Sequence, residues 1–212
     1  MQPSTDWKET IAADEDTRFA RHAEALRDIQ RKVAHGGPPS RALHAKANAG
    51  LEAELEVLAD LPDHAKAGLF ANPAKYQAFV RFSNGAAKRQ GDKRGDVRGI
   101  AVKVVGVDGK KLIPGMESER TQDFLAIRSP ATPFSTVDDF IALVVAAQNP
   151  LLLLPRLGSA IGWGRALSLL PKMARALSQP MTTLASTRYF SALPIRCGAY
   201  AVHYAFTPRD PV

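Results

Sequence analysis

Apolar residues near the N-terminus recur at steps of three and four, and this period predicts an amphipathic helix over Asp14–Ala34. Acidic residues stand at its start, where the helix dipole favours negative charge. His35-Gly36-Gly37 ends it, since glycine tolerates the left-handed conformation that follows many helices. We interpret residues 1–37 as an N-terminal helical arm ahead of one larger domain over residues 38–212.

Beyond this arm the period falls to two. Four apolar residues alternate with three glutamates over Leu51–Leu58, which predicts a half-buried strand. Runs rich in β-branched and aromatic residues predict three more strands, over Tyr76–Ser83, Val97–Val107 and Phe124–Arg128. Because no regular crossover helices separate them, we predict a mostly antiparallel sheet or barrel in an α+β protein.

The second half of the chain returns to helical patterning. A helix is predicted over Val137–Ala147, with Ser135 and Asp138 as a variant capping box at its start. We expect a break at Asn149-Pro150, because the residue before a proline avoids the α region. Strand-like composition comes back over Tyr189–Phe206 and the chain stops soon after, so we expect a sheet edge without its next partner and a fragment of a longer protein.

Composition is that of an ordinary globular protein: 45% of residues are apolar and 23% are charged, which excludes wholesale disorder. The formal net charge of +7 indicates an anionic partner, such as nucleic acid, lipid headgroups or a cofactor with acidic groups. The single cysteine, Cys197, excludes an internal disulfide and fits a reducing compartment. The N-terminus has no secretory signal, and we predict a cytoplasmic protein.

The longest uncharged run, Phe140–Pro155, is shorter than the roughly 20 apolar residues that cross a bilayer, so no membrane span is predicted. The Leu-rich stretch Leu151–Leu170 has Arg156, Arg165 and Lys172 beside it and could meet a membrane surface. Packing on the barrel, or lining an entrance for a hydrophobic substrate, is the favoured interpretation.

Other chemistries have weaker support. Basic pairs at Lys88-Arg89 and Lys93-Arg94 come without an aromatic stacking platform, so we expect a solvated loop and no nucleic-acid partner. Cysteine and histidine do not occur at zinc spacing, and the chain has no phosphate-cradling glycine-rich loop.

Three segments carry a more specific signal: RALHAKANAG over Arg41–Gly50, VRFSNG over Val80–Gly85 and DVRGIAVKV over Asp96–Val104. In this order and spacing they resemble the haem-dependent catalase family. The later TQDFLAIRSPATPF and RYFSALPIRCGAYAVHYAFTP are similar to segments of its shorter, divergent members, among them catalase-related peroxidases. The resemblance extends over roughly residues 38–212. It implies a catalase-like antiparallel β-barrel, incomplete at its C-terminus, with inserted helices.

The resemblance makes His44 the distal histidine of a haem site. Splitting peroxide requires a group that accepts and returns a proton near neutral pH, which suits imidazole. Ser83 would hydrogen-bond the other ring nitrogen and orient the ring. A period of two puts Arg81 and Ser83 on one face of their strand. An inward arginine needs an anion, either a haem propionate or a nearby aspartate.

The same resemblance assigns three further roles. Arg41 would be a second arginine that contacts a propionate. Asp96 would be the acid of the substrate channel, with a solvated loop carboxylate as the alternative, and Arg98 could pair with it. Phe134 would pack on the haem face, although an ordinary core phenylalanine is an equal alternative.

The chain departs from the family pattern at two places. No asparagine precedes Ile127-Arg128, and counting back from this pair puts Thr121 at the position that donates to peroxide, with Gln122 beside it. Catalase-type iron is held by tyrosine. Tyr200 follows Arg196 at the family spacing, but its strand-like surroundings argue against it. We therefore expect the iron ligand beyond residue 212 and assign no metal ligand within the chain.

The predicted function is haem-dependent decomposition of hydrogen peroxide, by catalase or peroxidase chemistry, in an oxidative stress response. The loss of one preorganised donor puts rapid catalase turnover in question. Alternatives are a lipid hydroperoxide isomerase acting on an organic hydroperoxide, a haem-binding module without turnover, and a basic nucleic-acid-binding domain. Assembly into a homo-oligomer is left open.

Overall fold

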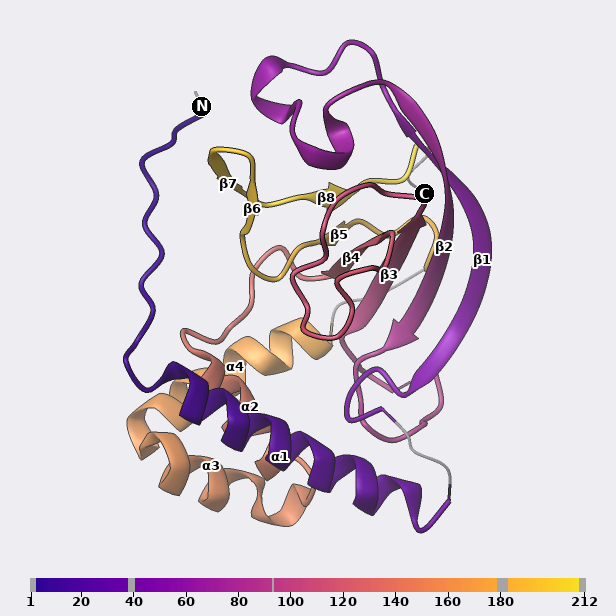
Figure 1. The fold of residues 1–212 in the computed structure, drawn as a ribbon. Helices are drawn as coiled ribbons and strands as arrows, with labels where there is room; N and C mark the ends of the chain where they lie inside the picture. Colours follow the sequence, from indigo (N-terminus) through magenta and orange to yellow (C-terminus); the bar gives the residue numbers. More distant parts are fainter. Residues whose placement is uncertain (1–2, 38–40, 93, 179–182, 210–212) are drawn as a thin grey trace.

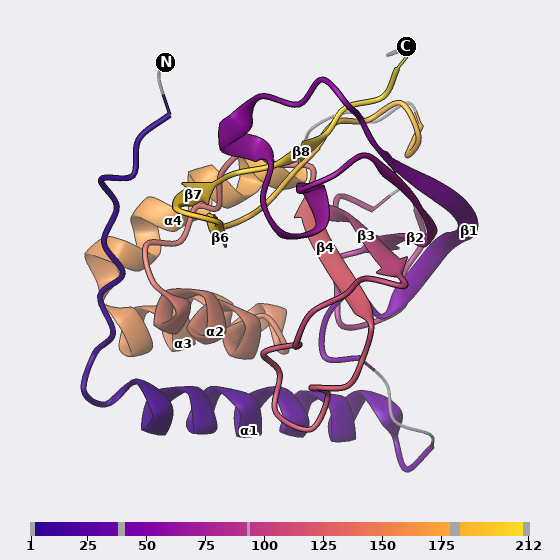
Figure 2. The same ribbon diagram turned by 45° about the horizontal axis from the view of Figure 1, so that its top comes forward.

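The computed structural model describes residues 3–37, 41–92, 94–178 and 183–209. A curled antiparallel sheet lies on one side of the molecule and a group of helices on the other (Figures 1 and 2). The strands are β1 (Lys46–Val57), β2 (Ala74–Asn84), β3 (Arg98–Val105), β4 (Thr121–Ile127), β5 (Tyr189–Phe190), β6 (Ile195–Cys197), β7 (Tyr200–Val202) and β8 (Ala205–Phe206). The helices are α1 (Glu15–Ala34), α2 (Val137–Ala146), α3 (Leu153–Ile161) and α4 (Trp163–Leu177), with 3₁₀ turns η1 (Asp63–Ala65), η2 (Gly68–Phe70) and η3 (Pro150–Leu152).

Within the described residues, six strands form the sheet in the order β1-β2-β3-β4-β5-β8, and β6 and β7 form a separate hairpin. Every pairing is antiparallel, and β1 to β4 follow one another as neighbours along the chain. The predicted α+β class with an incomplete antiparallel barrel is confirmed. The strand-like stretch at the C-terminus consists of four short strands.

The core lies on one face of this sheet. Side chains at alternate positions of β2, β3 and β4 are buried there together with a tyrosine of β5, as the period of two requires. The buried set is Ala78, Phe82, Ile100, Val102, Val104, Phe124, Ala126 and Tyr189. The opposite face of the same strands is open at Phe79 and Leu125, which are 42% and 66% exposed. The core therefore lies on one face, and the opposite face is exposed at these two positions.

β1 departs from the expected half-buried pattern. Val57, at its end, is buried, but Leu51 is 52% exposed and Ala53 is also exposed. β1 is an edge strand of the sheet, so the face that its alternation defines is only partly covered.

The helices bury their apolar faces against one another. Ile29 of α1 packs with Val144 of α2 and with Ala87, which ties the predicted arm to the rest of the chain. The boundary between an arm and a domain at residue 37 stays a prediction.

The predicted capping box of α2 was one residue too early. Thr136 is the N-cap of α2, and its hydroxyl accepts from the backbone N–H of Asp139 at 3.2 Å.

The break after α2 is confirmed. The side chain of Asn149 caps the turn η3, and Pro150 occupies its first position. Gly162, with φ of 86°, then joins α3 to α4 in a conformation that favours glycine.

Candidate functional site

His44 lies in the connection between α1 and β1 with a left-handed backbone, φ 52°. Such a conformation costs a non-glycine residue about 1–3 kcal/mol and persists only where its surroundings impose it. Here the N–H of His44 donates to the carbonyl of Gly85 at 3.0 Å, and its own carbonyl accepts from the guanidinium of Arg81. The backbone of His44 is therefore held from both sides by β2 and the residue that follows it.

The imidazole of His44 is positioned by two contacts from the sheet. Its Nδ1 lies 2.9 Å from Oγ of Ser83, a residue that is only 3% exposed. Its Cε1 lies 2.6 Å from the place where a Cβ at Gly99 would stand. Because Ser83 and Gly99 are paired across β2 and β3, the ring rests directly on the sheet, and only glycine at position 99 leaves room for it.

The electrostatic surroundings favour a neutral imidazole. Burial lowers the pKa of His44, and the guanidinium groups of Arg81 and Arg41 act in the same direction, whereas the carboxylate of Asp96 opposes them. Nδ1 of the ring contacts Ser83. The other ring nitrogen, Nε2, has no hydrogen-bond partner within the described residues. A neutral ring can accept a proton near pH 7.

Arg81 and Arg41 form a cationic pair beside the imidazole. Burial lowers the pKa of Arg81, and the charge of Arg41 lowers it further, so the two guanidinium groups repel each other. Among the described residues, no carboxylate lies within 4 Å of either. Arg41 is exposed and Arg81 is half-buried, so both guanidinium groups are accessible to an anionic group, which would reduce their repulsion.

Asp96 is buried, 6% exposed, and belongs to the loop between β2 and β3. Its Oδ2 accepts from Gln90 Nε2 at 2.9 Å and from the N–H of Ala86 at 3.3 Å. The expected pairing with Arg98 is wrong. Arg98 bonds to the side chain of Asn84 and to backbone carbonyls, because it points to the opposite face from the one that carries Gly99.

Thr121 is not brought together with His44. It starts β4, whereas Ile127 at the end of β4 is the partner of Gly99, so six residues, about 20 Å of extended strand, separate Thr121 from the site. Its hydroxyl accepts from Lys111 Nζ at 2.6 Å. Gln122 pairs with the core residue Val104, so its position belongs to the core face of the sheet. The geometry therefore gives no support to Thr121 as the donor to peroxide.

Two further predicted residues have packing partners of their own. Phe134 packs in the helical cluster with Leu143 and makes an edge-to-face contact with Phe140, its centroid at 5.4 Å. Tyr200 belongs to the β6–β7 hairpin and contacts the ring of His64, not a helix as an iron ligand of this type would require.

The remaining tyrosines also have other partners. Tyr76 and Tyr189 pack in the core, and the hydroxyl of Tyr204 bonds to the backbone of Leu125 at 2.7 Å. The described part of the chain also contains no group of three or more His, Cys, Asp or Glu side chains that could hold a bare metal ion.

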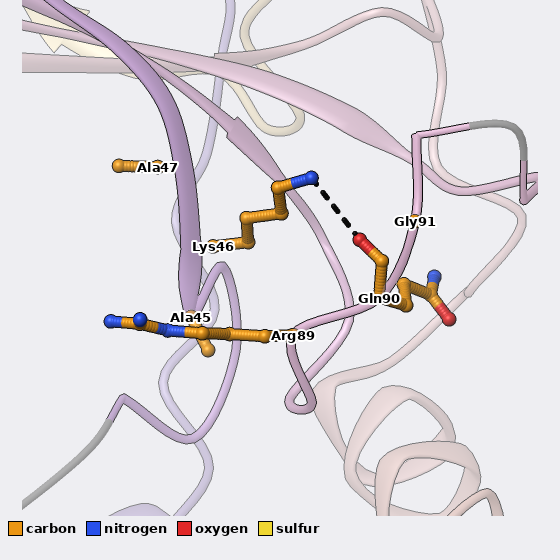
Figure 3. Close-up of a pocket in the computed structure, with 6 residues that line it drawn as sticks. All are labelled: Ala45, Lys46, Ala47, Arg89, Gln90 and Gly91. Atoms are coloured by element: carbon orange, nitrogen blue, oxygen red, sulfur yellow. Dashed lines mark hydrogen bonds between the residues drawn. The ribbon is translucent and has the colours of Figure 1, made fainter.

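A shallow pocket of about 480 Å³ lies next to His44 along the chain, between Ala45–Ala47 and Arg89–Gly91 (Figure 3). Lys46 Nζ donates across it to the carbonyl of Gln90 at 3.2 Å. This pocket is not formed by His44 or Arg81, so we place the candidate site on the open face of the sheet.

Sequence reasoning missed Gly99 as a residue of the site. It lies within the DVRGIAVKV segment, but a glycine in a strand has several structural uses, and only the pairing of β2 with β3 shows which ring it admits.

The fold is thus an open antiparallel half-barrel with a neutral histidine held against its polar face. A family model for Catalase matches residues 2–113, which is more than half of the chain, and the chain belongs to that family. The matched residues contain Arg41, His44, Arg81, Ser83 and Asp96 and end before β4. No curated protein matches the chain.

Proposed function

We propose that this chain supplies the distal side of a haem site that decomposes peroxide by catalase or peroxidase chemistry. The observation that carries the proposal is His44, whose backbone and ring position are held by neighbouring groups and whose pKa is lowered by burial. Its ring is tied to Ser83 at 2.9 Å and rests on Gly99. A structural histidine on the surface needs none of these constraints.

The open face of the sheet fits haem in charge and polarity. Haem carries two acidic propionates on an apolar ring, and its bound iron supplies the redox chemistry that peroxide cleavage needs. Arg81 and Arg41 lack a carboxylate among the described residues and would hold the propionates. The exposed Phe79 and Leu125 lie on the same face and would contact the ring.

The chain's own residues would then handle the proton. Nε2 of neutral His44 accepts a proton from the first oxygen of peroxide and returns it to the leaving oxygen. Ser83 keeps the ring orientation constant during this transfer. Asp96 raises the pKa of His44 and thereby favours the protonated ring after the first transfer.

The test begins with hemin titration of the complete protein that carries this chain, because the iron ligand is expected beyond residue 212, and binding is recorded as a shift of the Soret band. Oxygen release from hydrogen peroxide indicates catalase activity, and oxidation of an added donor with little oxygen indicates peroxidase activity. His44→Gln should lower either rate by about 10²–10⁴-fold, the usual contribution of a general acid-base group, with the hemin affinity retained.

His64→Gln is the matched control, since His64 is exposed and lies in η1. It should leave both the rate and the Soret shift unchanged. A wild-type protein that produces no Soret shift, or a His44→Gln variant that turns over normally, would contradict the proposal.

A further inference from the structure

The exposed surface of α4 divides into an apolar and a basic sector. With about 100° of rotation per residue, Trp163, Leu167 and Pro171 follow one another on one side of the exposed surface, and Lys172 and Arg175 lie on the adjoining side. Ala166 and Leu169 point the other way and are buried. Trp163 and Leu167 are 56% and 54% exposed, although their side chains are large and apolar.

The start of α3 extends the apolar surface. Leu151 is 90% exposed and Leu152 is 41% exposed in the turn η3 that leads into the helix. α3 and α4 lie on the opposite side of the molecule from β1 (Figures 1 and 2). Several large apolar side chains exposed on neighbouring helices mark an interaction surface more often than single exposed leucines do.

Most of the net positive charge lies in the part of the sequence that contains these helices, and α3 and α4 themselves carry Arg156, Arg165, Lys172 and Arg175. Residues 140–212 contain seven Lys or Arg and one acidic residue, Asp210, and therefore carry +6 of the net charge of +7. Residues 1–139 contain 21 basic and 20 acidic residues and are nearly neutral. Among the described residues, no carboxylate lies within 4 Å of Arg156, Lys172 or Arg175, whereas Arg165 pairs with Asp139.

We propose that the exposed side of α3 and α4 binds the surface of an anionic lipid bilayer. Leucine and tryptophan side chains enter the interfacial region, and the adjoining lysine and arginine contact acidic headgroups. A second copy of the chain would bring two strongly positive surfaces together, which disfavours it as the occupant. In the described residues no helix is long and apolar enough to cross a membrane, so the helices lie on the surface.

The proposal does not depend on haem chemistry, although the end of α4 contacts the segment just before Asp96. The last turn of α4 contacts the loop that carries Asp96, since a Cβ at Gly95 would stand 2.8 Å from the carbonyl of Leu177. Arg128, which follows β4, donates to the carbonyl of Ala176 at 3.3 Å.

The experiment is sedimentation of the whole chain with vesicles of phosphatidylcholine alone or with 30% phosphatidylglycerol. We expect binding at least about fivefold stronger to the anionic vesicles, weakened by high salt. In a Trp7→Phe background, the fluorescence of Trp163 should shift to the blue on binding. Circular dichroism and a urea midpoint establish that each variant is folded.

Matched variants separate local from global effects. Leu167→Ser and the double variant Lys172→Glu/Arg175→Glu should each lower vesicle binding at least about fivefold. Leu112→Ser, at a 93% exposed position of the β3–β4 loop, and Lys8→Glu/Lys110→Glu, with the same change of net charge, should not. Equal binding to both kinds of vesicle, no binding, or a dimer that Leu167→Ser dissociates would overturn the proposal.

Discussion

The two ends of the open sheet face differ in the ion pairing of their cations. At the β4 start, Lys103 and Lys111 lie 2.6 and 2.9 Å from the two oxygens of Asp123, and these bonds lower the pKa of Asp123 against the effect of its burial. At the His44 end, neither Arg81 nor Arg41 forms an ion pair within the described residues, and the charge of Arg41 adds to burial in lowering the pKa of Arg81. The lysines at one end of this face share a carboxylate in ion pairs, whereas the arginines at the other end form no ion pair within the described residues.

This difference separates a structural charge cluster from a ligand site. A cation that meets its counter-ion within the fold contributes to stability and needs nothing further. A cationic pair beside a constrained, neutral histidine has an energetic cost in the free protein, and an anionic ligand relieves it. The role of the face thus changes along about 20 Å of strand.

The largest effect is expected from Gly99→Ala, which disrupts the His44 end. The new Cβ would stand 2.6 Å from Cε1 of His44, so the ring must leave Ser83, and the peroxide turnover of the hemin-loaded protein should fall at least about 100-fold. Gly50→Ala in β1 is the control, because a Cβ there meets nothing within 4 Å. Equal turnover of the two variants would show that the ring does not need its place on the sheet.

Arg81→Leu tests whether the cationic pair serves a ligand. Hemin dissociation constants should rise about tenfold or more, since a charge-assisted contact to a propionate is lost. The free energy of unfolding of the free protein should fall by no more than about 1.5 kcal/mol, the contribution of the hydrogen bond that Arg81 donates to the carbonyl of His44. A large loss in the free energy of unfolding with unchanged hemin affinity would show that Arg81 serves the fold and not a ligand.

Asp123→Asn tests the ion pairs at the start of β4. It leaves Lys103 and Lys111 without their carboxylate, and the free energy of unfolding should fall by about 1 kcal/mol, as for partly exposed ion pairs. The hemin affinity should not change. Urea denaturation at low and high salt measures the first expectation, and a Soret titration measures the second. A tenfold loss of hemin affinity would extend the ligand site along the whole face.

The smallest effect is the pH dependence that His44 contributes. Burial lowers its pKa in the folded chain, so below about pH 6.5, the ordinary value, the unfolded chain binds the proton first. Stability should therefore fall as the pH drops, by at most about 1.4 kcal/mol per pH unit from this group. Urea midpoints from pH 5 to 8 should show a shallower slope for His44→Gln, and an identical slope would contradict the assigned burial.

Several features of the fold and the site could be predicted from the sequence. The period of two located the first strand, and the spacing of the family motifs placed His44, Ser83 and Arg81 together. The prediction of Thr121 as the donor to peroxide is not supported by the geometry, because counting along the chain cannot show which residue of β4 pairs with Gly99. Phe134 was equally compatible with two environments, and the suggested partner of Arg98, Asp96, is replaced by Asn84 and backbone carbonyls.

The sequence by itself determined the order and type of most elements, because hydrophobic period, caps and proline breaks act over a few neighbouring residues. It also determined that the positive charge gathers after residue 139. Only the tertiary structure decided the register of β3 against β4 and the close approach of His44 to Gly99. These depend on residues far apart in the chain, whose packing no local pattern records.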